Sequence, residues 1–271
     1  MSHFSATTFN TKNYAEARPT YVSKIYELIE SFHVGKRDAI VDAGCGPGMG
    51  TEGLLNLNFE TVYAVDPAIG MIEEGKKRPL GSKIEWLVGS GENLSQIIPK
   101  KVDMVTSFEA VQWMDIDKTW KECYDILNPG GTVAHVMYGR TEVLDNDEAT
   151  AIIFHLIDEK LRGYFKPQHQ TAFGLMDNIE PPSWAKRVER HKFLTKPKEG
   201  ENGCIMTRET NLEALAAQIL SWSPTDLYLK EHPNEDLVGD TIEKIMEVLG
   251  AKDLNHPVTM AWSMAVLLVS K

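Results

Sequence analysis

Val41–Thr51 reads VDAGCGPGMGT, and this stretch decides the fold. The residues that lead into it, Asp38–Asp42 (DAIVD), form a short apolar run of the kind found in buried parallel strands. The glycines that follow permit a tight turn and let backbone N–H groups approach a ligand at the start of the next helix. The stretch therefore predicts a strand, a glycine turn and a helix around a ligand.

The spacing of the glycines bears on the kind of ligand. The G-x-G-x-x-G pattern of dinucleotide sites fails when counted from Gly44, because its third glycine position is Met49. It matches at Gly48, Gly50 and Gly53, but that register falls where the helix is already expected. The glycines therefore do not favour a dinucleotide.

A different pattern, D-x-G-x-G-x-G, fits in place with Asp42, Gly44, Gly46 and Gly48. A carboxylate at Asp42 suits a cationic ligand, or the water around its ammonium group, and does not suit a pyrophosphate. Asp66 ends the next predicted strand, where an acid accepts hydrogen bonds from two ribose hydroxyls. S-adenosylmethionine has an amino-acid moiety, a sulfonium and no phosphate, so we predict it as the cofactor.

Strands and helices alternate on both sides of this turn, which predicts βαβ units. The fold class is therefore α/β, Rossmann-like, with a mostly parallel sheet and helices on both faces. Strands are expected at Asp38–Asp42, Glu60–Asp66, Lys83–Val88, Val102–Phe108, Thr132–Met137 and Pro257–Ser270, and helices at Tyr21–Phe32, Thr51–Leu57, Ile69–Lys77, Lys118–Leu127, Asp147–Leu161, Asn211–Ser221 and Leu237–Leu249.

The regular alternation stops after the fifth strand. Residues 140–210 contain one clear helix and a stretch rich in Pro and Lys without a period. We interpret residues 1–271 as a single domain, 34–139 as its cofactor-binding core, and 140–210 as a lid or substrate-specificity insertion.

Further cofactor contacts are predicted at the carboxyl ends of the strands, since open α/β sheets bind ligands along that edge. Pro67 and Met71 would cover the adenine ring with apolar surface, although core packing also explains a methionine. Ser90, Gly91 and Glu92 would hydrogen-bond the adenine amino group, with a simple capped loop as the alternative.

Here the chain resembles a known family. The segments VDAGCGPG, VYAVD, GSGENL, SFEAVQWMD and LNPGGTVA resemble, in order and spacing, the motifs of class I S-adenosylmethionine-dependent methyltransferases. The YxxxRPxY motif that contains Tyr14 and Arg18, the QWMD run at 112–115 and Trp222 resemble more specifically the fungal trans-aconitate and cantharidin methyltransferase group.

The resemblance implies roles for individual residues. Tyr14 and Arg18 would fold over the cofactor near its methionine carboxylate, and Trp113 would face the substrate. The residues that it implies for lining the cofactor site are Gly44, Gly46, Asp66, Ser90 and Glu92.

The group's members are directed at carboxyl groups of small molecules, so the resemblance implies a carboxylate acceptor and a methyl-ester product. A carboxylate is ionised at neutral pH and needs no general base, so we name no catalytic residue. Arg140, just past the fifth strand, is the predicted cationic clamp, with a solvated charge as the alternative. Phe108 would form the floor near the transferred methyl group, and Trp113 and Trp222 would contact the substrate unless they are core residues.

An alcohol acceptor would need a general base. His135, His155 and His169 are the available candidates, and each is also explained as a surface or core histidine.

The composition of the chain excludes some classes of partner molecule. The net charge of −11 argues against a nucleic-acid substrate, and no (D/N)PP(Y/F) motif follows the fourth strand. Three widely spaced cysteines without a CxxC pair predict neither a disulfide framework nor a metal site, and they favour the cytoplasm. No apolar stretch is long enough for a membrane span, and the oligomeric state stays open.

Two other functions stay open at this stage. One is a nicotinamide-dependent oxidoreductase on a similar sheet, which Asp42 and the failed glycine register disfavour. The other is a non-catalytic module that keeps the cofactor fold for binding.

Overall fold

A mixed sheet runs through the part of the chain that the computed structural model describes, residues 20–144 and 146–271. Its strands are β1 (Ala39–Ala43), β2 (Thr61–Asp66), β3 (Glu85–Val88), β4 (Val102–Phe108), β5 (Leu127–Val143), β6 (Arg187–Leu194), β7 (Asn202–Gly203), β8 (Met206–Asn211) and β9 (Pro257–Ser270). Their order is β3-β2-β1-β4-β5-β9-β6-β7, and β8 pairs with β9 beside this path. β1 to β5 pair in parallel, whereas β9 runs antiparallel to β5, β6 and β8. This topology confirms the predicted Rossmann-like fold class.

Helices cover both faces of the sheet and one of its edges. Among residues 20–144 and 146–271, no helix is long and apolar enough to cross a membrane. The α-helices are α2 (Ser23–Phe32), α3 (Thr51–Leu54), α4 (Ile69–Lys76), α5 (Leu94–Ile97), α6 (Ile116–Ile126), α7 (Asp147–His155), α8 (His169–Phe173), α9 (Leu212–Leu220), α10 (Ser223–Glu231) and α11 (Leu237–Leu249). Short 3₁₀ turns lie at η2 (Leu55–Leu57), η3 (Gly81–Lys83), η4 (Val111–Trp113) and η6 (Arg162–Tyr164), and a π-helical turn at η5 (Leu156–Lys160).

The two faces of the sheet belong to two hydrophobic cores, because neighbouring residues of a strand point to opposite sides. In β1, Ile40 lies in the core that includes α2, and Val41 in the core that includes α6. Met104 and Val105 of β4 divide in the same way. β1 and β4 are thus buried on both faces, which explains their continuous apolar runs in the sequence.

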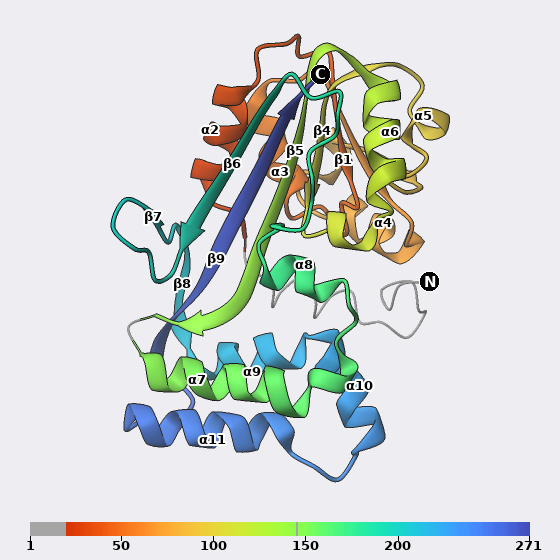
Figure 1. Cartoon of the computed structure of the whole chain (residues 1–271). Helices are drawn as coiled ribbons and strands as arrows, with labels where there is room; N and C mark the ends of the chain where they lie inside the picture. The colour runs from red at the N-terminus through yellow and green to blue at the C-terminus, as the bar shows by residue number, and fades with distance from the viewer. Residues whose placement is uncertain (1–19, 145) are drawn as a thin grey trace.

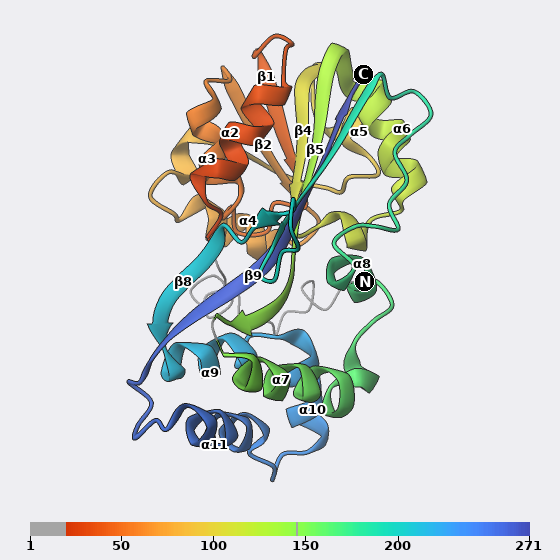
Figure 2. The same ribbon diagram turned by 60° about the vertical axis from the view of Figure 1, so that its left-hand side comes forward.

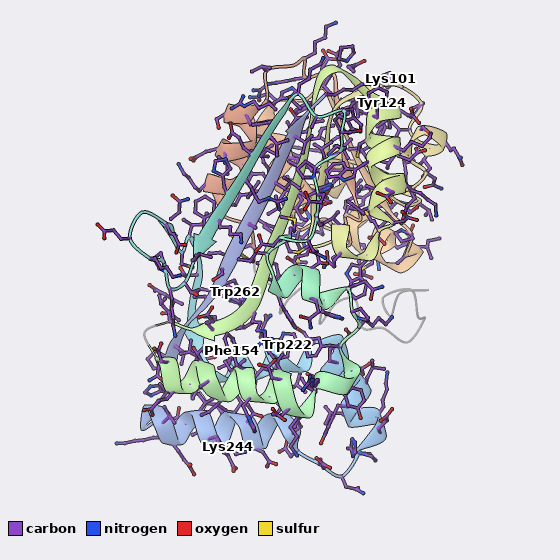
Figure 3. The ribbon with its side chains drawn as sticks, in the orientation of Figure 1. Lys101, Tyr124, Phe154, Trp222, Lys244 and Trp262 are labelled. Atoms are coloured by element: carbon purple, nitrogen blue, oxygen red, sulfur yellow. The ribbon has the colours of Figure 1, made fainter. Side chains whose placement is uncertain are left out.

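A layer of helices lies against the edge of the sheet at which the parallel strands end. Figures 1 and 2 show α7, α9, α10 and α11 below this edge, while β5, β8 and β9 extend beyond the other strands to reach the layer. Trp262 of β9 lies near this junction (Figure 3), is 1% exposed, and donates its indole N–H to Thr141 Oγ1 of β5 at 2.9 Å. The helical layer is therefore anchored to the sheet through β5 and β9, and through β8, which leads directly into α9.

Several elements differ from their predicted bounds. The fifth strand is longer than expected: it begins at Leu127, and its added first part contains Gly130, which has φ of +80°, and a shift in the pairing register with β4. The helix expected at Asp147–Leu161 is α-helical only to His155 and continues as the π turn η5. The expected insertion at 140–210 holds α7 and α8, whereas α9, α10 and α11 of the helical cover follow it in the chain; it also contributes β6 and β7 to the sheet.

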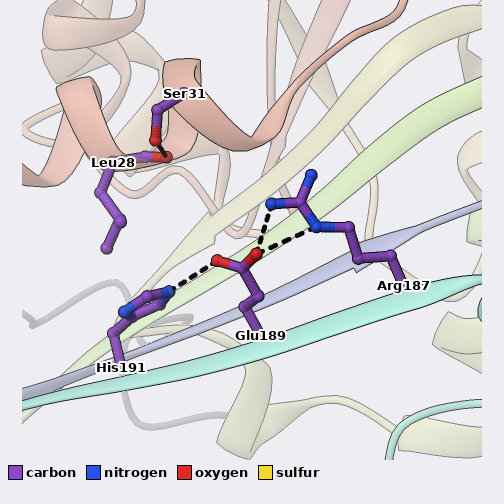
Figure 4. A network of polar contacts seen from close by, with 5 residues as sticks. All are labelled: Leu28, Ser31, Arg187, Glu189 and His191. Atoms are coloured by element: carbon purple, nitrogen blue, oxygen red, sulfur yellow. Dashed lines mark hydrogen bonds and ion pairs between the residues drawn. The ribbon is translucent and has the colours of Figure 1, made fainter.

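β6 was not predicted because it is a charged strand, and charged residues are uncommon in strands. Arg187, Glu189 and His191 alternate along it and so share one face. Figure 4 shows them as a chain of ion pairs opposite α2: Arg187 Nε donates to Glu189 at 2.9 Å, and His191 Nε2 lies 2.9 Å from the same carboxylate. Arg187 also lies over the ring of Phe32 at 4.3 Å. The strand forms because β9 offers it a free edge, which local sequence does not reveal.

Candidate active site

The turn after β1 has the left-handed backbone that glycine accommodates. Gly44, Gly46 and Gly48 have φ of +71°, +55° and +89°, whereas Gly53 lies inside α3. The N–H of Gly44 donates to the carbonyl of Val65 on β2 at 2.7 Å. The D-x-G-x-G-x-G register is thus the one that forms the turn.

Asp66 at the end of β2 holds this turn in place. Its Oδ2 accepts the backbone N–H of Gly46 at 2.9 Å, and its Oδ1 accepts that of Ala68 at 2.8 Å. The carboxyl group is largely buried, and this burial raises its pKa. Asp66 therefore orders the glycine turn while lining the cavity described below.

Asp42 occupies a different place from the one predicted. It is fully buried and does not line the cavity, because its carboxylate points between β4 and the start of α3. There it accepts hydrogen bonds from Thr51 Oγ1 at 2.6 Å and Thr106 Oγ1 at 3.0 Å. Asp42 was predicted to face a cationic ligand or the water around its ammonium group, whereas in the structure its carboxylate ties the helix to the sheet.

The burial of Asp42 predicts a pH dependence of stability. Loss of hydration raises the pKa of Asp42 from 3.8 to about 6, despite the two threonine hydroxyls that favour the ionised form. Since the folded protein binds this proton more tightly than the unfolded chain, stability present below about pH 4 is lost as the pH rises towards about 6, by at most about 3 kcal/mol. Thermal unfolding of wild type and Asp42→Asn from pH 4 to 7 tests this. We expect wild type to lose stability relative to the variant over that range, and parallel curves would contradict it.

Most of the predicted site residues line one cavity of about 270 Å³, at the carboxyl ends of β1, β2 and β4. Tyr14 and Arg18 lie outside the residues that the structure describes. The predicted residues that line the cavity are Gly44, Gly46, Asp66, Pro67, Met71, Ser90, Gly91, Glu92, Phe108, Trp113, Arg140 and Trp222.

The loop after β3 is a structured part of this wall. The backbone N–H of Ser90 donates to Asn93 Oδ1 at 2.9 Å, and Glu92 Oε1 accepts the N–H of Asp115 at 2.9 Å. Asn93 thus folds the loop, and its side chain makes no N-cap bond to α5. The capping alternative is therefore wrong for Asn93, whereas Ser90, Gly91 and Glu92 line the cavity and their contact with an adenine stays a prediction.

Other lining residues come from positions that carry no site signal in the sequence. Besides His169, already a candidate general base, the helical cover supplies Phe173 from α8, Gln218 from α9, and Pro224 from α10. These residues are far from the glycine turn in sequence, and no motif marks them. Their part in the site becomes visible only when the helical layer is placed against the sheet.

Arg140 lies on the side of the cavity nearest the helical cover and already holds a carboxylate. Its Nη1 and Nη2 donate to the two carboxylate oxygens of Asp158, both at 2.8 Å. The guanidinium lies over the rings of Phe173 at 4.5 Å and Phe154 at 5.1 Å. The solvated-charge alternative does not describe this residue, because its side chain is only 23% exposed.

The three histidines considered as general bases differ in burial and in their position relative to the cavity. His135 is buried, its Nδ1 lies 2.6 Å from Ser107 Oγ, and burial lowers its pKa to about 3. His155 is exposed, and neither it nor His135 lines the cavity. His169 does line it, with its ring edge-on to Trp113 at 5.0 Å. In the described part of the chain no group of three His, Cys, Asp or Glu side chains could hold a metal ion.

Comparisons with known proteins agree with this geometry. A family model described as a methyltransferase domain matches residues 41–135. The chain is 28% identical to the "Probable S-adenosylmethionine-dependent methyltransferase CRG1" of Saccharomyces cerevisiae, over 97% of this chain and 96% of that protein. It is 26% identical to the malonyl-[acyl-carrier protein] O-methyltransferase of Methylococcus capsulatus, over 88% of this chain and 82% of that protein.

A solved structure shows the same fold. It is the "Putative Type II Methyltransferase from Anaeromyxobacter dehalogenans", which matches with a TM-score of 0.73 at 21% identity and covers 93% of this chain and 97% of its own. Similarity along nearly the whole chain, together with a matching domain model over the glycine turn and its sheet, shows that this protein is an S-adenosylmethionine-dependent methyltransferase with a Rossmann-like fold.

Proposed function

We propose that this methyltransferase transfers a methyl group to a carboxylate oxygen of a small molecule. The observation that carries the proposal is Arg140, whose guanidinium fork lies at the cavity in the two-point geometry that recognises a carboxylate. Asp158 fills this fork in the described structure, and its side chain is 51% exposed. An acceptor carboxylate would therefore compete with Asp158 for Arg140. The specific likeness to the trans-aconitate and cantharidin methyltransferase group remains part of this proposal.

The residues on the sheet side of the cavity fit the cofactor. Asp66 presents a carboxylate for ribose hydroxyls, and Met71 and Pro67 supply apolar cover for an adenine ring. Space is open beside Gly46, since a Cβ there would meet no atom within 4 Å. When bound, S-adenosylmethionine supplies an activated methyl group: an acceptor oxygen forms the new O–CH₃ bond, and the electron pair of the broken S–CH₃ bond stays on sulfur. We propose these residues, with Ser90, Gly91 and Glu92, as its binding site.

The protein's own task would then be placement. An ionised carboxylate is already nucleophilic, so the site needs to hold it in line and to exclude water. Phe108, Trp113 and Trp222 supply apolar walls, and Arg140 supplies the orienting charge. This division of labour requires no general base.

We propose that the helical segments within 140–210 act as the lid over the acceptor. Ile157 of η5 and His169 and Phe173 of α8 face the cavity, which is small enough to suit a small molecule or a short pendant group. The malonyl-directed O-methyltransferase among the relatives supports an acid as the acceptor. Residues 34–139 would then form the cofactor-binding core.

Product chemistry tests the proposal. Purified protein is incubated with S-adenosylmethionine labelled in its methyl group and with two panels, one of small carboxylic acids and one of small alcohols and phenols. We expect label in the acid panel that mild base releases as methanol, since methyl esters hydrolyse and methyl ethers do not. Label that survives base would overturn the carboxylate proposal and would direct attention to His169 as a general base.

Arg140→Met tests the clamp. We expect the KM for the acid to rise roughly 10- to 100-fold, the loss that follows from removing a charged hydrogen-bond partner, with the affinity for S-adenosylmethionine unchanged. Arg162→Met is the matched control, because Arg162 is exposed on the neighbouring η6 and does not line this cavity. Equal effects of the two substitutions would show that Arg140 acts only through general charge.

A further inference from the structure

Gln218 of α9 is a buried amide without a partner. It is 1% exposed, and its Oε1 makes no hydrogen bond in the described structure. It nevertheless lines the cavity, together with Trp222, the residue that directly precedes α10. Figure 3 shows Trp222 between the sheet and the helical layer, the region that α9 approaches from below. The amide thus reaches the cavity from the side opposite the glycine turn.

An amide in this position lowers the stability of the free protein. Burying a polar group without a hydrogen bond loses its hydration and gains nothing in return, so native proteins keep few such groups. Thr119, Thr225 and His135 also have unpartnered buried atoms, but none of the three lines the cavity. Gln218 differs from them because a bound molecule can reach it.

Gln112 is the second such amide in the cavity wall, and its orientation is fixed. Its Nε2 donates to the backbone carbonyl of Glu109 at 3.1 Å, which leaves its Oε1 without a partner. Gln112 lies on η4, at the sheet side of the cavity, whereas Gln218 lies on the helical side. The two amides therefore present unmet hydrogen-bonding capacity at opposite walls.

We infer that Gln218 is a specificity-determining residue, which hydrogen-bonds an oxygen-bearing group of the acceptor other than the oxygen that is methylated. The unpartnered atom is Oε1, which accepts a hydrogen bond, so a hydroxyl of the acceptor is the group that meets it; a carbonyl or carboxylate would have to pair with Nε2 instead. The surrounding Phe173, Trp222 and Pro224 are apolar, so an acceptor without such a group would leave the amide unpaired in a dry site. The chemical class of the acceptor rests on the proposed function. The contact between the acceptor and Gln218 does not depend on it.

Gln218→Leu tests the inference with two independent readouts. Leucine keeps the approximate volume and removes the unpaired amide, so we expect the melting temperature of the free protein to stay level or rise. We expect the KM for the best acid of the labelling panel to rise roughly 10- to 100-fold, and the Kd for S-adenosylmethionine to change less than twofold. Gln96→Leu, at an exposed position of α5, is the control and should alter neither quantity.

Three outcomes are decisive. A fall in the melting temperature of Gln218→Leu would overturn the inference whichever acceptor is used, because the amide would then stabilise the fold. An unchanged acceptor KM would overturn it as well. If the label proves stable to base while Gln218→Leu still raises the KM of the labelled acceptor, the carboxylate proposal fails and the role of Gln218 stands. Gln218→Glu then identifies the group, since a carboxylate at this position should reject an acidic group far more strongly than a hydroxyl.

Discussion

Replacing Gly44 with alanine should abolish measurable binding of S-adenosylmethionine and destabilise the fold by about 2–5 kcal/mol. Gly44 has φ of +71°, which disfavours any residue with a Cβ by roughly 1–2 kcal/mol. A Cβ there would also lie 2.5 Å from the Cβ of Ala110, and overpacking of this kind costs about 1–3 kcal/mol. The turn must shift, and the proposed cofactor contacts shift with it. Titration calorimetry and thermal unfolding measure the two effects.

Gly70→Ala is the matched control. Gly70 lies in α4, has no left-handed φ, and a Cβ there would meet no atom within 4 Å. Alanine at a helical position should stabilise the protein by up to about 1 kcal/mol and leave cofactor binding unchanged. Unaltered S-adenosylmethionine affinity in Gly44→Ala would instead place the cofactor away from the turn.

Asp66→Ala should have the second largest effect. The sequence alone predicts a loss of roughly 1–3 kcal/mol of S-adenosylmethionine binding, from hydrogen bonds to the ribose. The structure adds a second loss, because the same carboxylate accepts the N–H groups of Gly46 and Ala68. We therefore expect the loss of binding free energy to lie at the upper end of that range, and the melting temperature to fall as well.

Asp66→Asn separates these two contributions. An asparagine keeps one acceptor oxygen and can retain a bond to the turn, so the melting temperature should fall less than in Asp66→Ala while cofactor affinity still drops. Asp117→Asn, at an exposed position in the first turn of α6, controls for the loss of one negative charge. Wild-type affinity in both Asp66 variants would refute the ribose assignment.

The parallel half of the fold was predictable because its signals are local. Each strand from β1 to β4 is a short apolar run that ends at glycine or a polar residue, and the helices between follow from periodicity. The cofactor side of the cavity follows from the same signals, since the carboxyl ends of parallel strands meet at one edge. This is why Gly44, Asp66 and Glu92 were found from the sequence.

The acceptor side was less predictable because it depends on contacts between distant segments. Arg140 was identified as a candidate from its place just past the predicted fifth strand, although it lies within the longer β5, and its pairing with Asp158 required the position of η5. Gln218 carried no signal, since a glutamine in an amphipathic helix is ordinarily exposed. Asp42 shows the opposite error: the correct motif residue was found, but its side chain turns towards Thr51 and Thr106 and away from the ligand cavity.

The comparisons with known proteins resolve the alternatives that the sequence left open. A nicotinamide-dependent oxidoreductase and a non-catalytic module both gave way to a methyltransferase, in line with the failed dinucleotide register. The residue that made the distinction by sequence, Asp42, acts within the fold as a link between helix and sheet.

The extension of β5, β8 and β9 beyond the rest of the sheet has an evolutionary consequence. The donor site is built from the early strands and their loops, whereas the wall opposite is carried by helices that reach the sheet through these three strands. Substitutions in α8, α9 and α10 can therefore accumulate without disturbing the glycine turn. Related enzymes should therefore differ in their acceptors through substitutions in this outer layer, while the donor site stays constant. Ancestral or chimeric helices grafted onto β5, β8 and β9 should transfer acceptor preference.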